Sequence, residues 1–313
     1  MKSLGFVFPG QGSQSVGMLM DIAQEYPEVQ DVFAEASDVL DYNLWHLVQD
    51  GPAEELNKTV HTQPALLAAS YALWKIITSN TSVKPIILAG HSLGEYTALT
   101  CANAIKFTDA IRLVAARGHF MQEAVPVGEG ALAAVVGLDD EAVENLCKKA
   151  ALTGEVLTPA NFNSPGQVVI AGQKIAVERA LVLAKESGAK LAKLLPVSVP
   201  SHCALMKPAA DRLADILSTI AIKSATIPVL SNVDVEEYTS SGSICDGLLR
   251  QLFMPVRWVE IIQSFAKAGV TQVIECGPGK VLTGLNKRIL PDIQLANTSD
   301  LASLQVVIET LRG

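Results

Sequence analysis

A serine in a glycine-flanked turn is the residue best suited to chemistry in this sequence. Ser92 lies in Gly90-His91-Ser92-Leu93-Gly94, a spacing typical of turns that raise a nucleophilic serine above the end of a strand. The pattern alone is weak, but an apolar run at 86–89 precedes it and a helical pattern at 95–104 follows it. The alternative is a glycine-rich turn with an incidental serine. The context favours the nucleophile.

A serine nucleophile needs a base, because its hydroxyl is barely ionised at neutral pH. The candidate bases are the five histidines, His46, His61, His91, His119 and His202. In a turn of this kind the side chain of His91 is expected to point away from the nucleophile. His202 lies in Pro200-Ser201-His202, in a loop between a predicted strand and a predicted helix, where functional residues are common. Chain position favours His202 without excluding the others.

A second glycine-rich turn, Gly10-Gln11-Gly12-Ser13-Gln14, directly follows a predicted strand at 4–8. A phosphate-binding loop is disfavoured, because the turn lacks the GxGxxG spacing and the lysine of a P-loop. Its backbone N–H groups could instead stabilise an oxyanion, together with the N–H of Leu93 at the start of the helix after Ser92. The alternative is an ordinary turn.

These turns depend on the strands and helices that hold them. Short apolar runs alternate with amphipathic stretches, which predicts an α/β fold. Outside residues 127–199 the pattern predicts strands at 4–8, 86–89, 228–233, 272–276 and 293–296. It predicts helices at 18–40, 64–78 with a proline in the first turn, 95–104, 108–124 with Thr108 as N-cap, 204–220, 247–252 and 259–268, then one ending near 289 and a last one at the C-terminus.

Residues 127–199 have a different order of elements. Strand, helix, strand, strand, helix and strand follow one another, which is typical of a ferredoxin-like unit. We therefore predict an inserted domain at 127–199 and a discontinuous larger domain made of 1–126 and 200–313. The alternative is that these elements continue one larger sheet. With an insertion, the active site is expected in the cleft between the domains.

Composition excludes several classes of protein. The 313 residues carry a net charge of −8, which disfavours nucleic-acid binding because that requires basic surfaces. No run of 18 apolar residues is present to span a membrane. Five scattered cysteines without a CxxC pair favour reduced thiols and a cytoplasmic location. Residues 1–60 hold ten acidic and two basic side chains and so account for the whole negative excess.

Six motifs together, in their order along the chain, closely resemble those of malonyl-CoA:acyl carrier protein transacylases of type II fatty acid synthesis. The motifs are Phe8-Pro9-Gly10-Gln11-Gly12-Ser13-Gln14, Gly90-His91-Ser92-Leu93-Gly94-Glu95-Tyr96, Asn161-Phe162-Asn163-Ser164-Pro165-Gly166-Gln167, Pro200-Ser201-His202, Ser231-Asn232 and Gly277-Pro278-Gly279-Lys280-Val281-Leu282. The resemblance extends from about residue 4 to residue 290.

The resemblance implies an α/β-hydrolase-like larger domain with an inserted ferredoxin-like smaller domain, in agreement with the pattern of elements. It also implies a reaction. The malonyl group of malonyl-CoA passes to a serine and then to the phosphopantetheine thiol of holo acyl carrier protein, by ping-pong transfer that supplies fatty acid biosynthesis. No metal or tightly bound cofactor is implied, and the family is usually monomeric.

The resemblance assigns roles to seven positions. They are Ser92 as nucleophile, His202 as general base, Gln251 with a backbone carbonyl that orients the histidine, the backbone amides of Gln11 and Leu93 as oxyanion hole, Arg117 as ligand of the malonyl carboxylate, and Asn232 as a polar residue beside the histidine. Gln11 and Asn232 are also expected at the substrate. The role of Arg117 is physically reasonable, because a planar guanidinium binds a carboxylate through two parallel hydrogen bonds.

Two other functions remain as alternatives. A serine esterase or thioesterase has the same serine turn and hydrolyses its substrate, and Arg117 and the turn at 10–14 argue against it. A non-catalytic module that binds carrier proteins would be expected to lack Ser92 or His202, and both are present.

The distribution of charge leaves room for an acidic protein partner. Carrier proteins of the resembled family are strongly acidic, and beyond residue 60 acidic and basic side chains balance. We predict that basic side chains at 190, 193, 280, 287 and 288 steer the carrier to the cleft. They are Lys190, Lys193, Lys280, Lys287 and Arg288.

Overall fold

The larger sheet consists of four parallel strands, of which three are largely buried, as is usual in parallel sheets, and the edge strand Gln294–Asn297 is partly exposed. The computed structural model describes residues 3–197 and 199–312. The strand order is β2-β1-β7-β8, with β1 Leu4–Phe8, β2 Ile87–Gly90, β7 Gln272–Glu275 and β8 Gln294–Asn297. Along β1, Phe6 and Phe8 belong to one hydrophobic core and Val7 to another. The sheet is therefore the middle layer of three.

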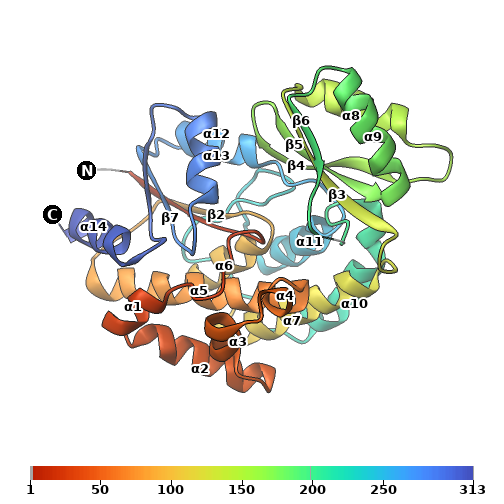
Figure 1. The fold of residues 1–313 in the computed structure, drawn as a ribbon. Coiled ribbons are helices and arrows are strands. Elements are labelled where there is room, and N and C mark those ends of the chain that lie inside the picture. The colour runs from red at the N-terminus through yellow and green to blue at the C-terminus, as the bar shows by residue number, and fades with distance from the viewer. Residues whose placement is uncertain (1–2, 198, 313) are drawn as a thin grey trace.

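Helices cover both faces of this sheet (Figure 1). The core of Phe6 and Phe8 includes residues of α1 Met20–Glu25, α2 Glu28–Leu40, α3 Leu44–Asp50, α4 Ala53–Leu56, α5 Thr59–Asn80, α6 Leu93–Cys101, α7 Phe107–Glu123, the short 3-10 helix η1 Ala204–Met206, α10 Lys207–Ser218, α11 Ser241–Gln251 and α14 Leu301–Arg312. The core of Val7 is closed by α12 Trp258–Lys267 and α13 Val281–Ile289.

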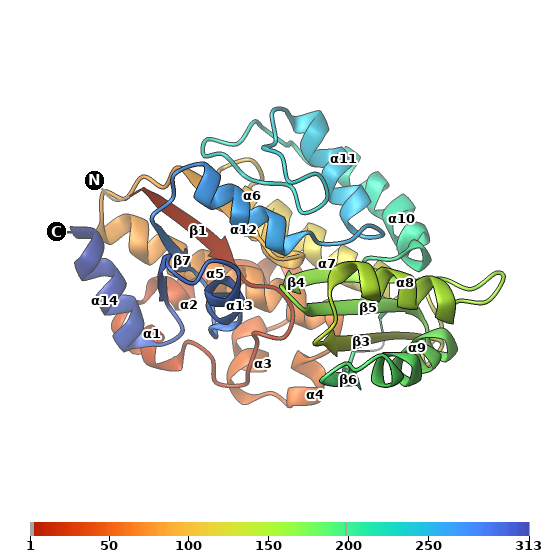
Figure 2. The same ribbon diagram turned by 90° about the horizontal axis from the view of Figure 1, so that it is seen from above.

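A second, antiparallel sheet lies beside the first (Figure 2). Its order is β4-β5-β3-β6, with β3 Gly130–Val136, β4 Leu157–Ser164, β5 Gln167–Gln173 and β6 Leu191–Leu194. The helices α8 Asp140–Ala150 and α9 Lys174–Glu186 pack on one face. The α/β-hydrolase-like fold with a ferredoxin-like second unit is confirmed, and a single continuous sheet is excluded. The domain boundaries, 1–126 with 200–313 and 127–199, remain our proposal.

Strand β4 is joined to the larger part of the molecule by backbone hydrogen bonds. The N–H of Phe162 donates to the carbonyl of Val256 at 2.9 Å, and the N–H of Val256 donates to the carbonyl of Ala160 at 2.9 Å. In addition, the guanidinium of Arg288 in α13 donates to the side-chain oxygen of Gln167 in β5 at 2.6 Å. These contacts fix the width of the space between the two sheets.

Several predicted boundaries were wrong. The helix predicted at 18–40 is two helices, because Pro27 lacks an N–H and keeps the preceding Tyr26 extended. The helix predicted from residue 64 begins at Thr59, so that Pro64 lies inside α5, and Thr108 is not an N-cap because α7 begins at Phe107.

The predicted strand at 228–233 was also wrong. Its residues form only isolated bridges, from Val229 to Leu88 and from Leu230 to Glu237. The chain turns away from the sheet at Asn232, whose N–H and carbonyl bond to the Glu95 side chain and the Arg257 N–H. The short helices α3 and α4 were not predicted.

Across the described ranges, no helix has both the length and the apolar character that a membrane crossing requires.

Candidate active site

The serine turn joins β2 to α6 through a backbone conformation that few residues adopt. Ser92 has φ 51° and ψ −107°, a region that costs about 1–3 kcal/mol for a residue with a Cβ and is found mainly at functional sites. The flanking glycines are required by close approach. A Cβ on Gly90 would lie 1.8 Å from the carbonyl carbon of Gly94, and one on Gly94 would lie 2.0 Å from the carbonyl oxygen of Phe8. The turn therefore presents Ser92 at the carboxyl end of the parallel sheet.

His202 is the histidine that contacts this serine. Its Nε2 lies 2.8 Å from the Ser92 Oγ, and its Nδ1 lies 2.7 Å from the carbonyl oxygen of Gln251. Because a carbonyl only accepts, Nδ1 carries the hydrogen and Nε2 is left as the acceptor of the serine proton. The backbone carbonyl at the end of α11 thus occupies the place that a carboxylate holds in other serine sites.

The surroundings of His202 keep its imidazole neutral. The side chain is 2% exposed, and burial, followed by the positive charge of Arg117, lowers its pKa to about 3. A neutral imidazole is the form that accepts a proton. The geometry therefore suits a general base, and the lowered pKa keeps the imidazole in the form that can accept a proton.

Two backbone N–H groups near Ser92 are free to bind an oxyanion. The N–H of Ser92 donates to Asn232, and those of Gly94 and Glu95 donate to backbone carbonyls within the turn. Among the described residues, the N–H groups of Leu93 and Gln11 have no protein acceptor. Both residues line the same cavity as Ser92, which is the arrangement an oxyanion hole requires.

Arg117 reaches this cavity from α7 although its side chain is only 1% exposed. Its Nη2 lies 3.2 Å from the Ser92 Oγ and 2.8 Å from the Gln251 Oε1, and its Nη1 lies 2.8 Å from the Gln63 Oε1. The guanidinium also lies over the ring of Tyr96, 5.2 Å from its centre. A positive charge is thus fixed beside the Ser92 hydroxyl.

The side chain of Asn232 bonds to the serine turn. Its side chain accepts from the N–H of Ser92 at 2.8 Å and donates to the carbonyl of Gly90 at 2.7 Å. It is fully buried and does not line the cavity. Asn232 therefore supports the shape of the serine turn, and its expected place at the substrate remains a prediction.

The other four histidines bond to other partners. His91 bonds through Nε2 to the Asn163 Oδ1 at 2.8 Å, which ties the serine turn to β4. His46 and His119 pair with acidic side chains one turn further along their own helices, and His61 contacts the carbonyl of Glu55. His91 lines the same cavity as Ser92, and the expectation that its side chain points away from Ser92 remains a prediction.

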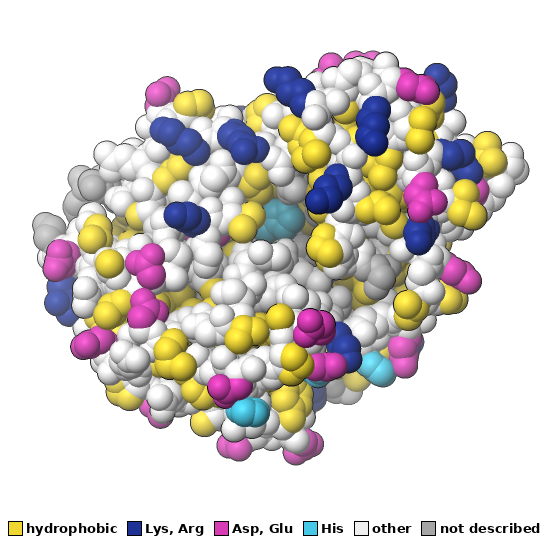
Figure 3. Space-filling view, in the orientation of Figure 1, with side chains coloured by type: hydrophobic (Ala, Val, Ile, Leu, Met, Phe, Trp, Pro, Cys, Tyr) yellow, Lys and Arg dark blue, Asp and Glu magenta, His cyan; other side chains and the backbone are white. Residues whose placement is uncertain are grey.

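The cavity has a volume of about 190 Å³ and lies between the two sheets. Besides the residues above, it is lined by Asn161 and Asn163 of β4 and by apolar side chains of both parts of the molecule, including Met121, Leu132, Val169, Leu195, Val197, Val281, Leu282 and Leu285. Gln167 is not among the lining residues. Figure 3 shows the hollow from outside, with Lys and Arg side chains around it.

The predicted basic residues lie on both sides of this opening. Lys190 and Lys193 are exposed beside or on β6, whose chain continues into the lining residues Leu195 and Val197. Lys280, Lys287 and Arg288 are exposed at or on α13, which also lines the cavity. Arg288 is partly engaged by Gln167 and Lys287 by the carbonyl of Pro291.

Three residues of the site were given no role from the sequence. Gln63 bonds to Arg117, while Glu95 and Tyr238 bond to each other beneath the serine turn. One signal was available for Glu95, since it is the only charged residue in the α6 sequence. No pattern in the sequence distinguishes Gln63 or Tyr238 from other helix and loop residues.

The fold and the site define an acyltransferase. A family model described as "Acyl transferase domain" matches residues 5–307. The malonyl CoA-acyl carrier protein transacylase of Haemophilus influenzae is 58% identical over 99% of this chain and 100% of that protein. The chain therefore belongs to the family of malonyl CoA-acyl carrier protein transacylases.

Solved structures agree with this assignment. The crystal structure of an acyl carrier protein S-malonyltransferase from Vibrio cholerae has a TM-score of 0.95 and 58% identity, and the match covers 97% of this chain and 99% of that one. A malonyl-transacylase in complex with its type II PKS acyl-carrier protein has a TM-score of 0.97 and 55% identity, with 98% and 99% covered.

Proposed function

We propose that this protein transfers a malonyl group from malonyl-CoA to the phosphopantetheine thiol of an acyl carrier protein through a malonyl ester of Ser92. The observation that carries the proposal is the placement of Ser92, with a neutral imidazole 2.8 Å from its Oγ and a guanidinium nitrogen 3.2 Å away on another side. The names of the relatives, and the carrier protein bound to one of them, support the same reaction. We propose further that the protein is a monomer and that it acts in the cytoplasm.

In the first half-reaction, His202 Nε2 accepts the proton of Ser92 as Oγ attacks the thioester carbonyl carbon. The negative charge that develops on the carbonyl oxygen is stabilised by the N–H groups of Gln11 and Leu93. When the intermediate collapses, the C–S bond breaks and His202 returns the proton to the thiolate of CoA. Arg117 holds the free carboxylate of malonate, which fixes the thioester over the nucleophile.

The second half-reaction uses the same groups in reverse. The phosphopantetheine thiol gives its proton to His202 as its sulfur attacks the ester carbonyl, and the C–O bond to Ser92 breaks as Oγ takes the proton back. A thiolate is a better nucleophile than water at neutral pH. The apolar lining around Ser92 limits the access of water, which favours transfer over the hydrolysis that an esterase carries out.

Intact-mass measurement tests the proposal in two steps. Mixing the protein with malonyl-CoA is expected to add one malonyl group, and adding holo carrier protein is expected to remove that group from the enzyme and place it on the carrier. Free malonate with no malonyl carrier would instead establish a thioesterase. A protein that is never labelled would leave only the carrier-binding alternative.

The buried state of His202 predicts an unusual pH dependence of acylation. Its pKa lies below the ordinary 6.5, at about 3, so the basic form persists as the pH falls from 7.5 to 5. The rate of Ser92 labelling by acetyl-CoA, which has no carboxylate for Arg117, is expected to change by less than about twofold over this range. A histidine of ordinary pKa would lose roughly thirtyfold. A fall in rate with a midpoint near pH 6.5 would contradict the assignment, provided that circular dichroism shows the same fold at both pH values.

The basic residues beside the cavity predict an electrostatic contribution to carrier binding. Reversing the charge of Lys190 and Lys193 to Glu is expected to raise the KM for holo carrier by about tenfold and to flatten its dependence on salt. The KM for malonyl-CoA serves as an internal reference. Lys75→Glu with Lys84→Glu is a matched control, since both lysines line a separate hollow near the start of β2. Equal effects of the two double variants would show that net charge alone matters.

A further inference from the structure

Glu95 is a buried carboxylate that the proposed transfer steps do not use. It lies in the first turn of α6 and is fully buried. Its Oε1 accepts from the hydroxyl of Tyr238 at 2.6 Å and from the N–H of Asn232 at 3.0 Å, and its Oε2 accepts from the Nε2 of Gln251 at 2.5 Å. An ionised carboxylate only accepts, so three donors suit it. The position at a helix N-terminus also favours negative charge.

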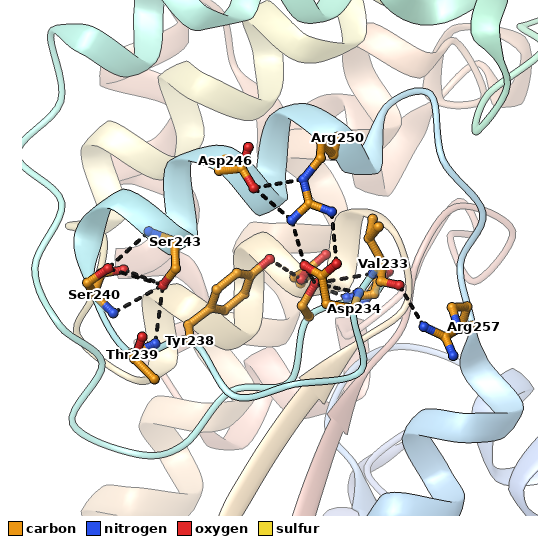
Figure 4. A network of polar contacts seen from close by, with 12 residues as sticks. Val233, Asp234, Tyr238, Thr239, Ser240, Ser243, Asp246, Arg250 and Arg257 are labelled. Carbon is orange, nitrogen blue, oxygen red and sulfur yellow. Dashed lines mark hydrogen bonds and ion pairs between the residues drawn. The ribbon is translucent and has the colours of Figure 1, made fainter.

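The donors to Glu95 are held in place by a second network. Figure 4 shows Tyr238 pointing inward from the loop that carries Val233 and Asp234, with Arg250 of α11 on the outer side. The guanidinium of Arg250 binds Asp234 at 2.8 and 2.6 Å and Asp246 at 2.7 Å. The loop of Tyr238 is thereby fastened to the helix that ends at Gln251, so these two donors to Glu95 form one unit.

Glu95 fixes which way the amide of Gln251 faces. The Nε2 donates to Glu95 and to the carbonyl of Ser92 at 2.8 Å, while the Oε1 accepts from Arg117 at 2.8 Å. A carboxylate can only accept and a guanidinium can only donate. A reversed amide would place oxygen against oxygen at Glu95 and N–H against N–H at Arg117. The side-chain amide of Gln251 therefore fits in only one of its two orientations.

Through this amide, Glu95 acts on Arg117 without touching it. Among residues 3–197 and 199–312, no carboxylate lies within 4.0 Å of the Arg117 guanidinium, which is held by the amide oxygens of Gln63 and Gln251. Its Nε is buried and has no hydrogen-bond partner in the described part of the chain. A carboxylate in direct contact would occupy donors that a substrate carboxylate needs. The amide oxygen of Gln251 takes one N–H of the guanidinium, where a bidentate carboxylate would take two, so one more donor is left for the substrate.

We propose that Glu95 is a positioning residue for malonyl selectivity. Glu95 orients the side-chain amide of Gln251, and this amide holds Arg117 facing the cavity. The negative charge of Glu95 lies near Arg117 and balances its positive charge without a direct contact between the two side chains. The inference rests on the proposed function, since it assumes that Arg117 receives the substrate carboxylate. On this proposal, α6 contributes to substrate selectivity through Glu95 as well as following the serine turn. A purely structural residue would affect all acyl substrates equally.

The test compares first-order rates of Ser92 labelling by malonyl-CoA and acetyl-CoA, measured by intact mass. Glu95→Gln is expected to lower the malonyl-to-acetyl ratio by roughly ten- to a hundredfold, chiefly through the malonyl rate, as expected for the loss of a hydrogen bond to a charged group. Glu275→Gln is the matched control, because Glu275 is another buried carboxylate, bonded instead to Leu282 and Thr283 of α13. It is expected to keep the ratio. If Glu95→Gln lowers both rates equally, or neither, the proposal is wrong.

A charge swap separates positioning from a simple balance of charge. In the double variant Glu95→Gln with Gln251→Glu, the negative charge is restored but is placed directly on Arg117, while the backbone carbonyl of residue 251 still faces His202. The melting temperature is expected to recover towards that of the wild type, whereas malonyl selectivity is expected to stay low. Recovery of both would show that only the charge balance matters, and the proposal would be overturned.

The pH dependence of the malonyl-to-acetyl ratio gives an independent readout. If Glu95→Gln does not fold, Tyr238→Phe, which removes one donor to Glu95, takes its place in the test. Burial raises the pKa of Glu95 to about 7, with Arg117 of α7, Tyr96 of α6 and Tyr238 of the loop as the charged or titratable groups facing it. Protonation mimics the amide variant. The malonyl-to-acetyl ratio of the wild type is expected to fall below pH 7 and that of Glu95→Gln to be flat; parallel profiles would refute the role. Absence of any Ser92 labelling in the wild type would instead refute the proposed function.

Discussion

Replacing Ser92 by alanine is expected to abolish the malonyl-enzyme and to lower the transfer rate by roughly 10⁴-fold or more, as the loss of a nucleophile does in other serine enzymes. Ser92 is the hydroxyl in contact with His202 Nε2, and its Oγ also accepts from Arg117. The ester is therefore expected at this oxygen. The substitution keeps a Cβ and removes a single oxygen, so the turn and the cavity are expected to persist.

The measurement is the mass of the protein after mixing with malonyl-CoA. Ser187→Ala, at the exposed C-terminus of α9, is the control and is expected to be labelled like the wild type. Covalent labelling of Ser92→Ala at undiminished stoichiometry would identify another nucleophile. An unlabelled variant that still transfers malonyl groups would show direct transfer without an enzyme ester.

Local pattern pointed to Ser92 because it lies in a glycine-flanked turn directly after β2, whereas the position of His202 in the loop after β6 favoured it without excluding the other histidines. Their contact could not be predicted from the pattern, since they lie 110 positions apart with the whole antiparallel sheet between them. Asn232 shows the limit most clearly. An amide side chain can satisfy any nearby donor or acceptor, and only the folded chain shows that it binds the N–H of Ser92 and the carbonyl of Gly90.

The burial of polar side chains was another feature that could not be predicted from the sequence. Glu95 interrupts an apolar helix as a surface residue would, and its burial depends on Tyr238 and Gln251, which come from distant segments. The predicted strand at 228–233 was wrong for the same reason. Its apolar composition suits a strand, but its backbone at Asn232 bonds to Glu95 and to Arg257 instead of continuing along β2.

Replacing Arg117 by alanine is expected to lower malonyl labelling of Ser92 by roughly 10²- to 10³-fold while changing acetyl labelling little. The variant loses hydrogen bonds between a buried guanidinium and a carboxylate, each worth about 1.5–3 kcal/mol, and leaves the substrate charge unpaired. Acetyl groups carry no such charge. The ratio of the two rates therefore isolates the contribution of Arg117 to selectivity from any general effect on the site.

Two further variants make the result specific. Arg112→Ala removes an arginine of the same helix that is exposed and pairs with Asp109, and it is expected to keep the wild-type ratio. Arg117→Lys retains the charge but not the two-pronged geometry, and an intermediate ratio is expected. If Arg117→Ala keeps the wild-type selectivity, the carboxylate is bound elsewhere and both Arg117 and the role of Glu95 behind it are excluded. If Arg117→Lys matches the wild type, charge alone is sufficient and the orientation set by Gln251 has no part in selectivity.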